Sequence, residues 1–414
     1  MSTEAQAIGG GRARLARRAL AHELPGAALP GGEGAEGGWI SLGWGYPDPT
    51  TFPARELEEA LRAALAEEAG RILQYGGGSG PARVRRAVAE HLVSRGLELD
   101  EGELFLTGGS TQGFDAVARL FLDPGDPVWT ERPSYYGAIR VFGLHEAHLR
   151  GIPADRAGLD VEALEAALRE AAPGERPKFL YVVPSFQNPT GALLPPERRK
   201  RLVELAERYD FYLVEDDAYA ELWFDEPAPP PLKALAPERV FLLGTASKLV
   251  APGLRLGWCI PPRHLRDAYV RVQPGGEGSP LALAALAGYL EAAGAEGGRL
   301  FERHVEELRR HYARRRDVLE AALERELGGR LSWERPRGGF FHWVTLPPGV
   351  DAAAWLGAAR RRGVDLVPGQ AFFFDGGGAD RARLCFSYVP PEQLEEGARR
   401  LRLALDEVEE GGGG

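Results

Sequence analysis

Between residues 100 and 260 the sequence alternates short apolar runs with helical patterns, and this alternation constrains the fold more than any other feature. In Leu104-Phe-Leu-Thr107, Phe179-Leu-Tyr-Val-Val183 and Phe211-Tyr-Leu-Val214 nearly every residue is apolar. Near-continuous apolar strands that alternate with helices are typical of a sheet buried on both faces, and such sheets are mostly parallel. We therefore predict an α/β fold with a mostly parallel central sheet flanked by helices. Further strands are expected at 128–130, 240–243 and 256–260, and helices at 110–122, 135–142 and 196–210.

The rest of the chain divides around this sheet. Residues 1–45 are small, charged and glycine-rich, and we assign them to an N-terminal arm. Residues 46–294 are assigned to a large domain that holds the sheet, and residues 295–410 to a smaller α+β C-terminal domain. The glycines at 411–414 are expected to form a flexible tail. The smaller domain is predicted to contain helices at 299–328, 351–362 and 392–408 and strands at 341–346 and 384–389.

Composition argues against several classes of protein. A net charge of −10 disfavours a sequence-independent grip on nucleic acid. The longest apolar stretch, 281–290, is shorter than the ~20 residues that span a bilayer, and the N-terminus lacks the apolar core of a signal peptide. Two cysteines, Cys259 and Cys385, make neither a disulfide framework nor a metal site. We therefore expect a cytoplasmic protein that binds no metal, nucleic acid or membrane.

Lysine is scarce, because only four of the 50 basic residues are lysine. A lysine retained against such a bias is a candidate for chemistry that arginine cannot perform, since arginine stays charged. Lys178, Lys200 and Lys233 lie among arginines or next to loop prolines and are expected at the surface. Lys248 directly follows a predicted buried strand between hydroxyl side chains, so it is the candidate for a desolvated nucleophile.

Two segments at predicted strand ends carry groups suited to anions and polar rings. In Thr107-Gly-Gly-Ser-Thr-Gln-Gly113 a strand ends in two glycines, and Ser110, Thr111 and Gln112 begin a helix. Such a turn aims free backbone N–H groups and hydroxyls at an anion, although an ordinary capped helix has the same pattern. Asn188 precedes Pro189, which favours extended geometry and allows the amide to project from the strand end or simply to form a turn.

Two more strand ends carry charged groups. Asp216 lies in Val214-Glu-Asp-Asp-Ala-Tyr219, where an acid can hold a protonated heterocycle nitrogen or cap a helix. Arg255 lies seven residues after Lys248 and can bind a phosphate with two parallel hydrogen bonds. Ligands of open α/β sheets bind at the carboxyl ends of strands, so the four segments should meet. An anion nest, an acid, an amide and an amine together predict a site for pyridoxal 5′-phosphate (PLP).

These segments resemble the class I and II aminotransferases of PLP fold type I, over residues 40–408. The most specific matches are Ser247-Lys248 with Pro252-Gly-Leu-Arg-Leu-Gly257, Gln187-Asn-Pro-Thr-Gly191 and Asp216-Asp-Ala-Tyr219. Other segments are most similar to the branch of 2-aminoadipate and aromatic or kynurenine-type aminotransferases. The resemblance implies transfer of an amino group from an L-amino acid to a 2-oxo acid. It also implies a homodimer with the active site at the interface.

The resemblance implies roles for the residues that face the cofactor. Lys248 would form the internal aldimine and carry the proton, and Asp216 would pair with the pyridine nitrogen. Asn188 and Tyr219 would bind the ring hydroxyl, and Tyr135 would stack on the ring. The residues implied for the phosphate are Ser110, Thr111, Gln112, Thr245, Ser247 and Arg255, together with Tyr75 of the partner subunit.

The resemblance also implies where the substrate binds. Arg383 would hold the α-carboxylate through two hydrogen bonds, with Asn188 beside it. Gly43 would lie near the substrate. Trp44 and Tyr46, which follow it, are bulkier than the residues usual in this branch and would narrow or reshape the pocket for the substrate side chain. Two alternatives stay open: another PLP reaction (a decarboxylase, a lyase or an oxygen-using oxidase), or a transcription regulator that senses PLP. A regulator would need a DNA-binding domain, and only residues 1–39 precede the match.

Overall fold

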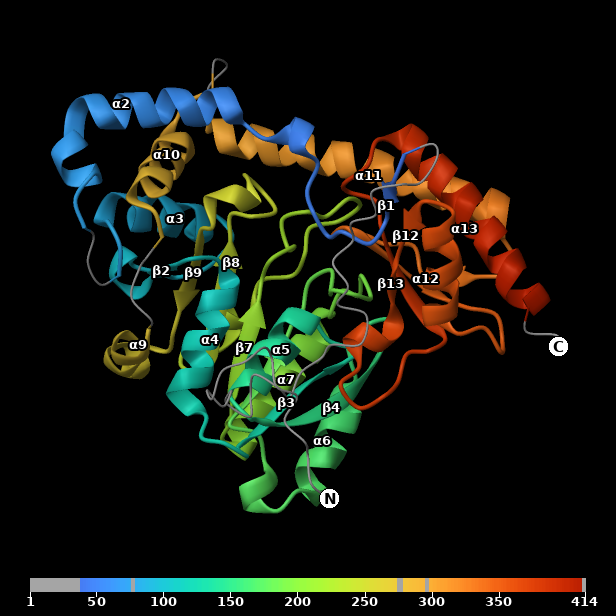
Figure 1. Ribbon diagram of the computed structural model, residues 1–414. Coiled ribbons are helices and arrows are strands. Elements are labelled where there is room, and N and C mark those ends of the chain that lie inside the picture. The colour runs from blue at the N-terminus through green and yellow to red at the C-terminus, as the bar shows by residue number, and fades with distance from the viewer. Residues whose placement is uncertain (1–37, 76–78, 274–277, 295–297, 412–414) are drawn as a thin grey trace, which may run out of the picture.

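The computed structural model describes residues 38–75, 79–273, 278–294 and 298–411. Most of the predicted arm and the last three residues of the predicted tail therefore lie outside the described residues. Within the described ranges, the main sheet has eight strands in the order β2-β9-β8-β7-β6-β3-β4-β5 (Figure 1). Its strands are β2 (Phe105–Thr107), β3 (Pro127–Arg132), β4 (His148–Asp155), β5 (Gly158–Leu159), β6 (Phe179–Val182), β7 (Tyr212–Asp216), β8 (Val240–Thr245) and β9 (Gly257–Ile260).

Most of the sheet is parallel, as predicted. Strands β4, β3, β6, β7 and β8 pair in parallel, whereas β9 is antiparallel to both β8 and β2. The parallel strands end at one edge of the sheet. Since β9 runs in the opposite direction, its first residue, Gly257, pairs with Thr245 and Thr107 at that same edge. The loop that carries Arg255 therefore comes to the carboxyl ends of the other strands.

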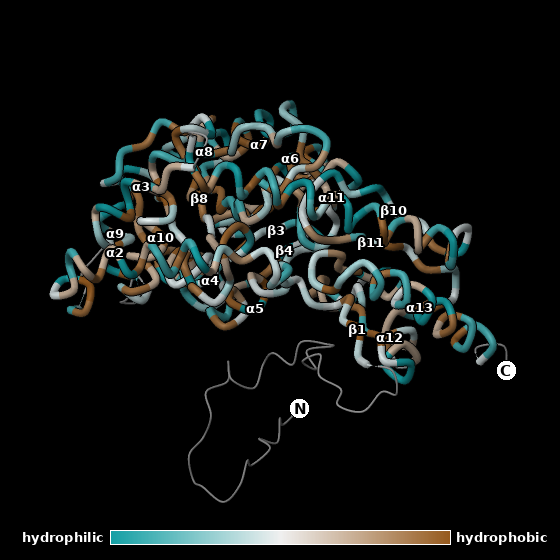
Figure 2. Tube along the Cα trace, turned by 90° about the horizontal axis from the view of Figure 1, so that it is seen from above, coloured by the Kyte–Doolittle hydropathy of each residue, from teal (hydrophilic) through white to brown (hydrophobic). Residues whose placement is uncertain are grey.

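Helices cover both faces of the sheet. Helices α4 (Ser110–Phe121) and α5 (Tyr136–Leu144) lie on one side, and α6 (Val161–Glu170), α7 (Pro196–Tyr209) and α8 (Leu232–Leu235) lie on the other (Figure 2). Strand residues alternate between the two layers: Phe179 and Tyr181 pack with the first, Leu180 and Val182 with the second. Every residue of β6 is buried, which explains the continuous apolar run in the sequence.

The C-terminal part contains a second, antiparallel sheet in the order β10-β11-β14-β13. A short separate pair joins β1 (Ile40–Ser41) to β12 (Val364–Asp365), so the chain around residue 40 lies against the C-terminal part. The long helix α11 runs beside α13 across the top of the molecule (Figure 1). The elements are β10 (Ser332–Trp333), β11 (Phe341–Thr345), β13 (Val367–Pro368), β14 (Arg381–Cys385), α11 (Leu300–Leu327), α12 (Ala352–Arg361) and α13 (Pro391–Gly411).

One predicted strand is misplaced. The sequence predicted a strand at 384–389, but β14 begins at Arg381 and ends at Cys385. Arg381 and Arg383 hide the strand pattern, because arginine is rarely buried in a strand. Arg383 is nevertheless 2% exposed, while Ala382 and Leu384 pack into the core on the other face.

The remaining helices surround these two sheets. Helix α2 packs along α10 at the upper left of the molecule (Figure 1). Within the described ranges, no helix combines the length and the apolar character that crossing a membrane requires. The remaining helices are α2 (Ala54–Ile72), α3 (Ala82–Ser94), α9 (Arg266–Val272) and α10 (Pro280–Glu291), with 3₁₀ turns η1 (Pro49–Thr51), η2 (Glu101–Glu103), η3 (Pro173–Glu175), η4 (Pro252–Leu254), η5 (Arg263–Leu265) and η6 (Gly369–Phe372).

A buried histidine makes the stability of the C-terminal part depend on pH. His342 on β11 is fully buried, and its ring packs edge-on against Phe386. Burial lowers the pKa of His342 from 6.5 to about 3. Below about pH 6.5, His342 is therefore protonated in the unfolded chain but stays neutral in the folded chain. Stability should fall as the pH decreases from 6.5, by up to about 1.4 kcal/mol per pH unit from this group.

We predict that His342→Phe removes this part of the pH dependence. Urea unfolding at pH 6.5 and pH 5 should show a smaller loss of unfolding free energy in the variant than in the parent, by roughly 1–2 kcal/mol. The matched control is His148→Phe at an exposed position of β4. Equal pH dependence in all three proteins would contradict the prediction.

Candidate active site

Lys248 lies just past β8, where its amine is half-buried among aromatic rings. Its Nζ donates a hydrogen bond to the carbonyl of Gly45 at 2.9 Å and lies 5.8 Å from the ring centre of Tyr219 and 5.7 Å from that of Phe340. Desolvation, helped by Arg383 and Arg255, lowers the pKa of Lys248 to about 8, although Cys385 and Asp216 oppose the change. The predicted desolvated amine is therefore present at the edge where the strands end.

Lys233 corrects one expectation from the sequence. It was predicted at the surface, yet it is 6% exposed, and burial lowers its pKa to about 8 as well. Its Nζ donates to the carbonyls of Pro237, Val240 and Pro261 at 2.7, 2.8 and 3.0 Å. These three acceptors use all three of its protons. Lys233 therefore fastens the ends of two strands together and has no proton left for a ligand.

Asp216 is the last residue of β7, so the strand extends two residues further than the sequence predicted. Its Oδ2 accepts a hydrogen bond from the hydroxyl of Tyr181 at 2.7 Å. Its Oδ1 is buried and has no hydrogen-bond partner in the described part of the chain. Burial raises the pKa of Asp216 to about 6, whereas Tyr181 and Lys248 favour the charged form.

The two acids beside Asp216 serve the fold. Glu215 accepts the backbone N–H groups of Leu232 and Lys233 at 2.8 and 3.0 Å. Asp217 pairs with Arg95 at 2.7 Å. Of the three consecutive acids, Asp216 alone has a carboxylate oxygen that is both buried and unpartnered among the described residues.

The anion nest forms where α4, β8 and β9 meet. Gly109 has φ 95°, a conformation that glycine adopts without strain, and it precedes the free N–H groups of Ser110 and Thr111 at the start of α4. The guanidinium of Arg255 lies against Gly109, with Nη2 3.5 Å from where a Cβ would stand. The hydroxyls of Thr245 and Ser247 lie 2.9 Å apart. Gln112 contributes its side-chain oxygen to the N–H of Gly108.

Asn188 and Arg383 form a second cluster, joined to the segment around Gly43. The Nη1 of Arg383 donates to Oδ1 of Asn188 at 2.8 Å, and Nη2 donates to the carbonyl of Gly43 at 2.7 Å. The guanidinium lies over the rings of Phe341 and Phe372 at 4.2 and 5.1 Å. The Asn188 side chain is thus engaged through its oxygen.

Two residues that the sequence analysis missed hold Asn188 in place. The buried Arg199 on α7 donates to the carbonyls of Leu194 and Pro184, at both ends of the loop that carries Asn188. The side chain of Gln187 donates to the carbonyl of Pro133 at 2.9 Å and so ties this loop to the one that carries Tyr135. An arginine in the sequence of an amphipathic helix gives no sign of such a role, because most arginines are exposed.

The aromatic candidates lie at different depths. Tyr219 is buried, and burial raises its pKa well above the ordinary value. Burial also raises the pKa of Tyr135; Tyr136 and Asp216 add to the rise, whereas Arg383 and Arg255 oppose it. The rings of Trp44 and Tyr46 lie 4.3 Å apart on the segment that Arg383 contacts. Tyr75, beyond α2, is 96% exposed, so its predicted role across a dimer interface stays a prediction.

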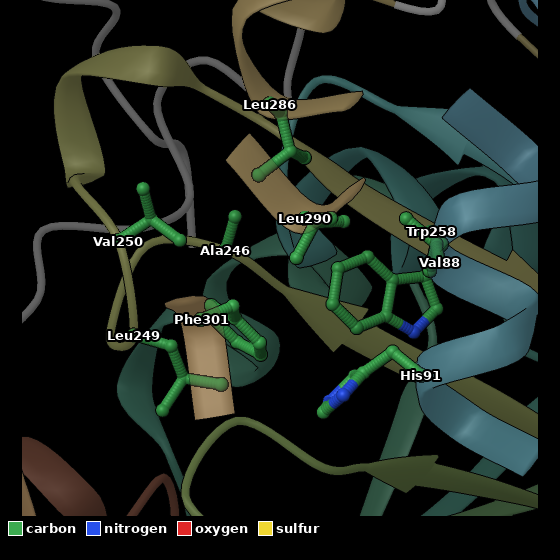
Figure 3. Close-up of a pocket in the computed structure, with 9 residues that line it drawn as sticks. All are labelled: Val88, His91, Ala246, Leu249, Val250, Trp258, Leu286, Leu290 and Phe301. Atoms are coloured by element: carbon green, nitrogen blue, oxygen red, sulfur yellow. The ribbon is translucent and has the colours of Figure 1, made fainter. Parts of the chain in front are cut away.

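A small apolar pocket backs the Lys248 segment (Figure 3). Lys248 does not line it, although its neighbours Ala246, Leu249 and Val250 do. The other lining residues come from α3, β9, α10 and α11, and among them only His91 and Trp258 carry polar atoms. This pocket therefore supports the segment and contributes no group to the chemistry. The lining residues are Val88, His91, Ala246, Leu249, Val250, Trp258, Leu286, Leu290 and Phe301.

The donor set at the strand ends fits PLP. The unpartnered Oδ1 of Asp216 suits a protonated ring nitrogen, and the nest with Arg255 suits a phosphate. The Lys248 amine suits an aldehyde, because its lowered pKa leaves a part of it uncharged near neutral pH. A second arginine, Arg383, acts electrostatically on the lysine and can bind a carboxylate.

Comparison with known proteins agrees with this geometry. Residues 39–401 match the model of the family "Aminotransferase class I and II". The chain is 37% identical to aromatic-amino-acid aminotransferase 1 of Thermococcus litoralis over 89% of this chain and 88% of that protein. It is 38% identical to the 2-aminoadipate transaminase of Thermus thermophilus over 89% and 90% of the two chains. The crystal structure of an α-aminoadipate aminotransferase from Thermus thermophilus, complexed with N-(5′-phosphopyridoxyl)-L-leucine, superposes with a TM-score of 0.82 at 37% identity, over 90% of this chain and 94% of that one.

The chain therefore belongs to the class I and II aminotransferases. Its fold is PLP fold type I, its cofactor is PLP, and its reaction is PLP-dependent transamination. The resemblance drawn from Lys248, Asp216 and the Asn188 segment is confirmed.

The close contact between β9 and α4 gives a test of the nest. A Cβ on Gly257 would lie 2.7 Å from the backbone carbon of Gly109 and from the carbonyl oxygen of Gly244. We predict that Gly257→Ala forces these backbones apart and costs roughly 1–3 kcal/mol of unfolding free energy. It should also weaken PLP binding, because Gly109 precedes the free N–H groups of α4.

The matched control is Gly253→Ala in the same loop, where a Cβ would meet nothing within 4 Å. Chemical denaturation and titration of the cofactor-free protein with PLP measure both effects. If the two variants behave alike, the close contact does not hold the nest.

Proposed function

We propose that this chain transfers an amino group from an L-amino acid to a 2-oxo acid with Lys248 as its catalytic base and Asp216 as the partner of the pyridine nitrogen. The observation that carries the proposal is the pair of groups at one sheet edge: a desolvated amine and a buried carboxylate oxygen with no partner in the described residues. Bound PLP supplies the electron sink that makes the substrate Cα–H acidic. The protein supplies binding, orientation and proton transfer.

Lys248 is suited to moving a proton because its pKa is lowered to about 8, close to the operating pH. The rings of Tyr219 and Phe340 exclude water around its amine. Among the described residues, the amine donates a hydrogen bond to one acceptor, the carbonyl of Gly45. Releasing one hydrogen bond therefore frees it for a ligand.

Arg383 is proposed to bind the α-carboxylate of both substrates. The amino acid and the oxo acid carry this group in the same place, so one arginine can serve both halves of the reaction. Its guanidinium is already oriented by Asn188 and Gly43 and lies between Phe341 and Phe372, where an ion pair is poorly screened. Trp44 and Tyr46 follow Gly43, and we assign them to the side-chain end of the substrate site.

The remaining assignments concern the cofactor. Arg255 and the start of α4 are proposed to hold the phosphate, supported by the approach of the guanidinium to Gly109. Asn188 and Tyr219 are proposed for the ring hydroxyl, and Tyr135 for stacking on the ring. The hydroxyl and amide groups assigned to the phosphate are those of Ser110, Thr111, Gln112, Thr245 and Ser247.

We also propose a cytoplasmic homodimer. Cys259 and Cys385 are both free and buried, which suits a reducing compartment. Leu73 is 68% and Tyr75 96% exposed, and an apolar pair this exposed at the end of a helix suits a contact with a second copy.

The first test is the absorption spectrum of the protein loaded with PLP. We expect a visible band that bleaches when an L-amino acid is added without any oxo acid and returns when a 2-oxo acid follows. Lys248→Ala should lack the band, because the amine that bonds to the cofactor is gone.

Lys233→Met serves as the matched control, since it removes the other buried lysine. This variant should be less stable but should keep the band. A band that persists with every amino acid while oxygen is consumed or carbon dioxide is released would favour another PLP reaction. Absence of a band in the parent protein would contradict the assignment of Lys248.

The second test asks whether Tyr75 acts on the site of the other subunit. Lys248→Ala and Tyr75→Ala are each expected to be impaired, and activity at limiting PLP should return when the two are unfolded together and refolded as hybrids. A hybrid contains one site with both an intact lysine and an intact tyrosine only if Tyr75 serves the other subunit. No recovery in the hybrids would contradict the shared site.

A further inference from the structure

In the part of the chain that the structure describes, Asp216 meets a single hydrogen-bond donor from a side chain, the hydroxyl of Tyr181. The two residues lie on neighbouring parallel strands, β6 and β7, where Tyr181 is in register with Val214. The hydroxyl donates to Oδ2 at 2.7 Å, and the two residues are 0% and 4% exposed. The other oxygen, Oδ1, has no hydrogen-bond partner among the residues that the structure describes.

Packing does not require the hydroxyl of Tyr181. The ring lies against Phe114 and Phe142, with ring centres 6.1 and 5.6 Å away, and a phenylalanine would make the same contacts. A buried phenol is costly without an acceptor, so the hydroxyl is retained where a carboxylate can accept from it. The acceptor of the Tyr181 hydroxyl is Asp216, the residue proposed to pair with the pyridine nitrogen.

We propose that Tyr181 is a positioning residue for the cofactor: its hydroxyl holds Oδ2 of Asp216 and so fixes the plane in which Oδ1 faces the ring nitrogen. This proposal rests on the assignment of Asp216 made above. The hydrogen bond to Oδ2 restricts rotation of the Asp216 carboxylate, so Oδ1 stays directed toward the position proposed for the ring nitrogen. The hydrogen bond also favours the charged carboxylate, which a protonated ring nitrogen requires.

Of the other charged and titratable groups around Asp216, some raise the pKa of its carboxyl and others lower it. Lys248 favours the charged carboxylate, whereas Asp217 opposes it. Glu131 at the end of β3 is a buried acid whose own pKa is raised to about 8 by burial, with Asp216 adding to the rise. The hydroxyl of Tyr181 is the group that touches the carboxylate directly. The groups that interact electrostatically with Asp216 are Glu131, Tyr135, Tyr181, Asp217, Tyr219 and Lys248.

The experiment compares Tyr181→Phe with the parent by titrating cofactor-free protein with PLP and following the visible band. Loss of a hydrogen bond to an ionised group should weaken PLP binding by about tenfold. The matched control is Tyr269→Phe, a fully buried tyrosine in the same core layer whose hydroxyl has no hydrogen-bond partner among the described residues. The control should bind PLP within about twofold of the parent.

A double-mutant cycle separates positioning from a general effect on the fold. If Tyr181 acts through Asp216, Tyr181→Phe should change PLP affinity far less in an Asp216→Asn protein than in the parent. Equal weakening in both backgrounds, or binding by Tyr181→Phe within about twofold of the parent, would overturn the proposal. Failure of the proposed function looks different, because the parent itself would then give no visible band with PLP.

Discussion

The site depends on the contact between two backbones, Gly257 at the start of β9 and Gly109 before α4. Because β9 runs against its neighbours, the loop before it returns to the edge where the parallel strands end. Only a residue without a side chain allows the two backbones to approach so closely. The contact brings the Arg255 guanidinium to the free N–H groups of a helix, and these two sources of positive potential act on the same point.

Three consecutive acids with buried side chains, Glu215, Asp216 and Asp217, also lie at this edge of the sheet, and each has different partners. Glu215 is satisfied by backbone N–H groups and Asp217 by Arg95. Within the described ranges, Asp216 receives one side-chain hydrogen bond, at Oδ2, and its Oδ1 has no partner. Leaving a buried carboxylate oxygen unpaired costs stability, and such a cost is typical of positions that bind a ligand. The hydrogen bonds of Glu215 and the ion pair of Asp217 stabilise the end of β7 and offset this cost.

Much of this arrangement could be predicted from the sequence. The apolar runs of β6 and β7 revealed a sheet buried on both faces, because successive residues of β6 pack alternately against one layer of helices and the other. The scarcity of lysine drew attention to Lys248, and the strand ends drew attention to Asp216 and Asn188. Lys233 showed the limit of that reasoning, because three carbonyls that bury an amine leave no local pattern. Tyr181 and Arg199 were missed for the same reason: their partners lie on other strands and loops.

The segment from β1 to Tyr46 is bound to the C-terminal part at every step. Ile40 pairs with Val364, the carbonyl of Leu42 accepts from Cys385, Gly43 is held by Asp365 and Arg383, and the carbonyl of Tyr46 accepts from Ser387. The start of the described chain therefore packs as a part of the C-terminal region, although it is far from that region in the sequence. Segments far apart in the sequence therefore join at the proposed substrate site, while most of the groups proposed for the cofactor come from the residues between them.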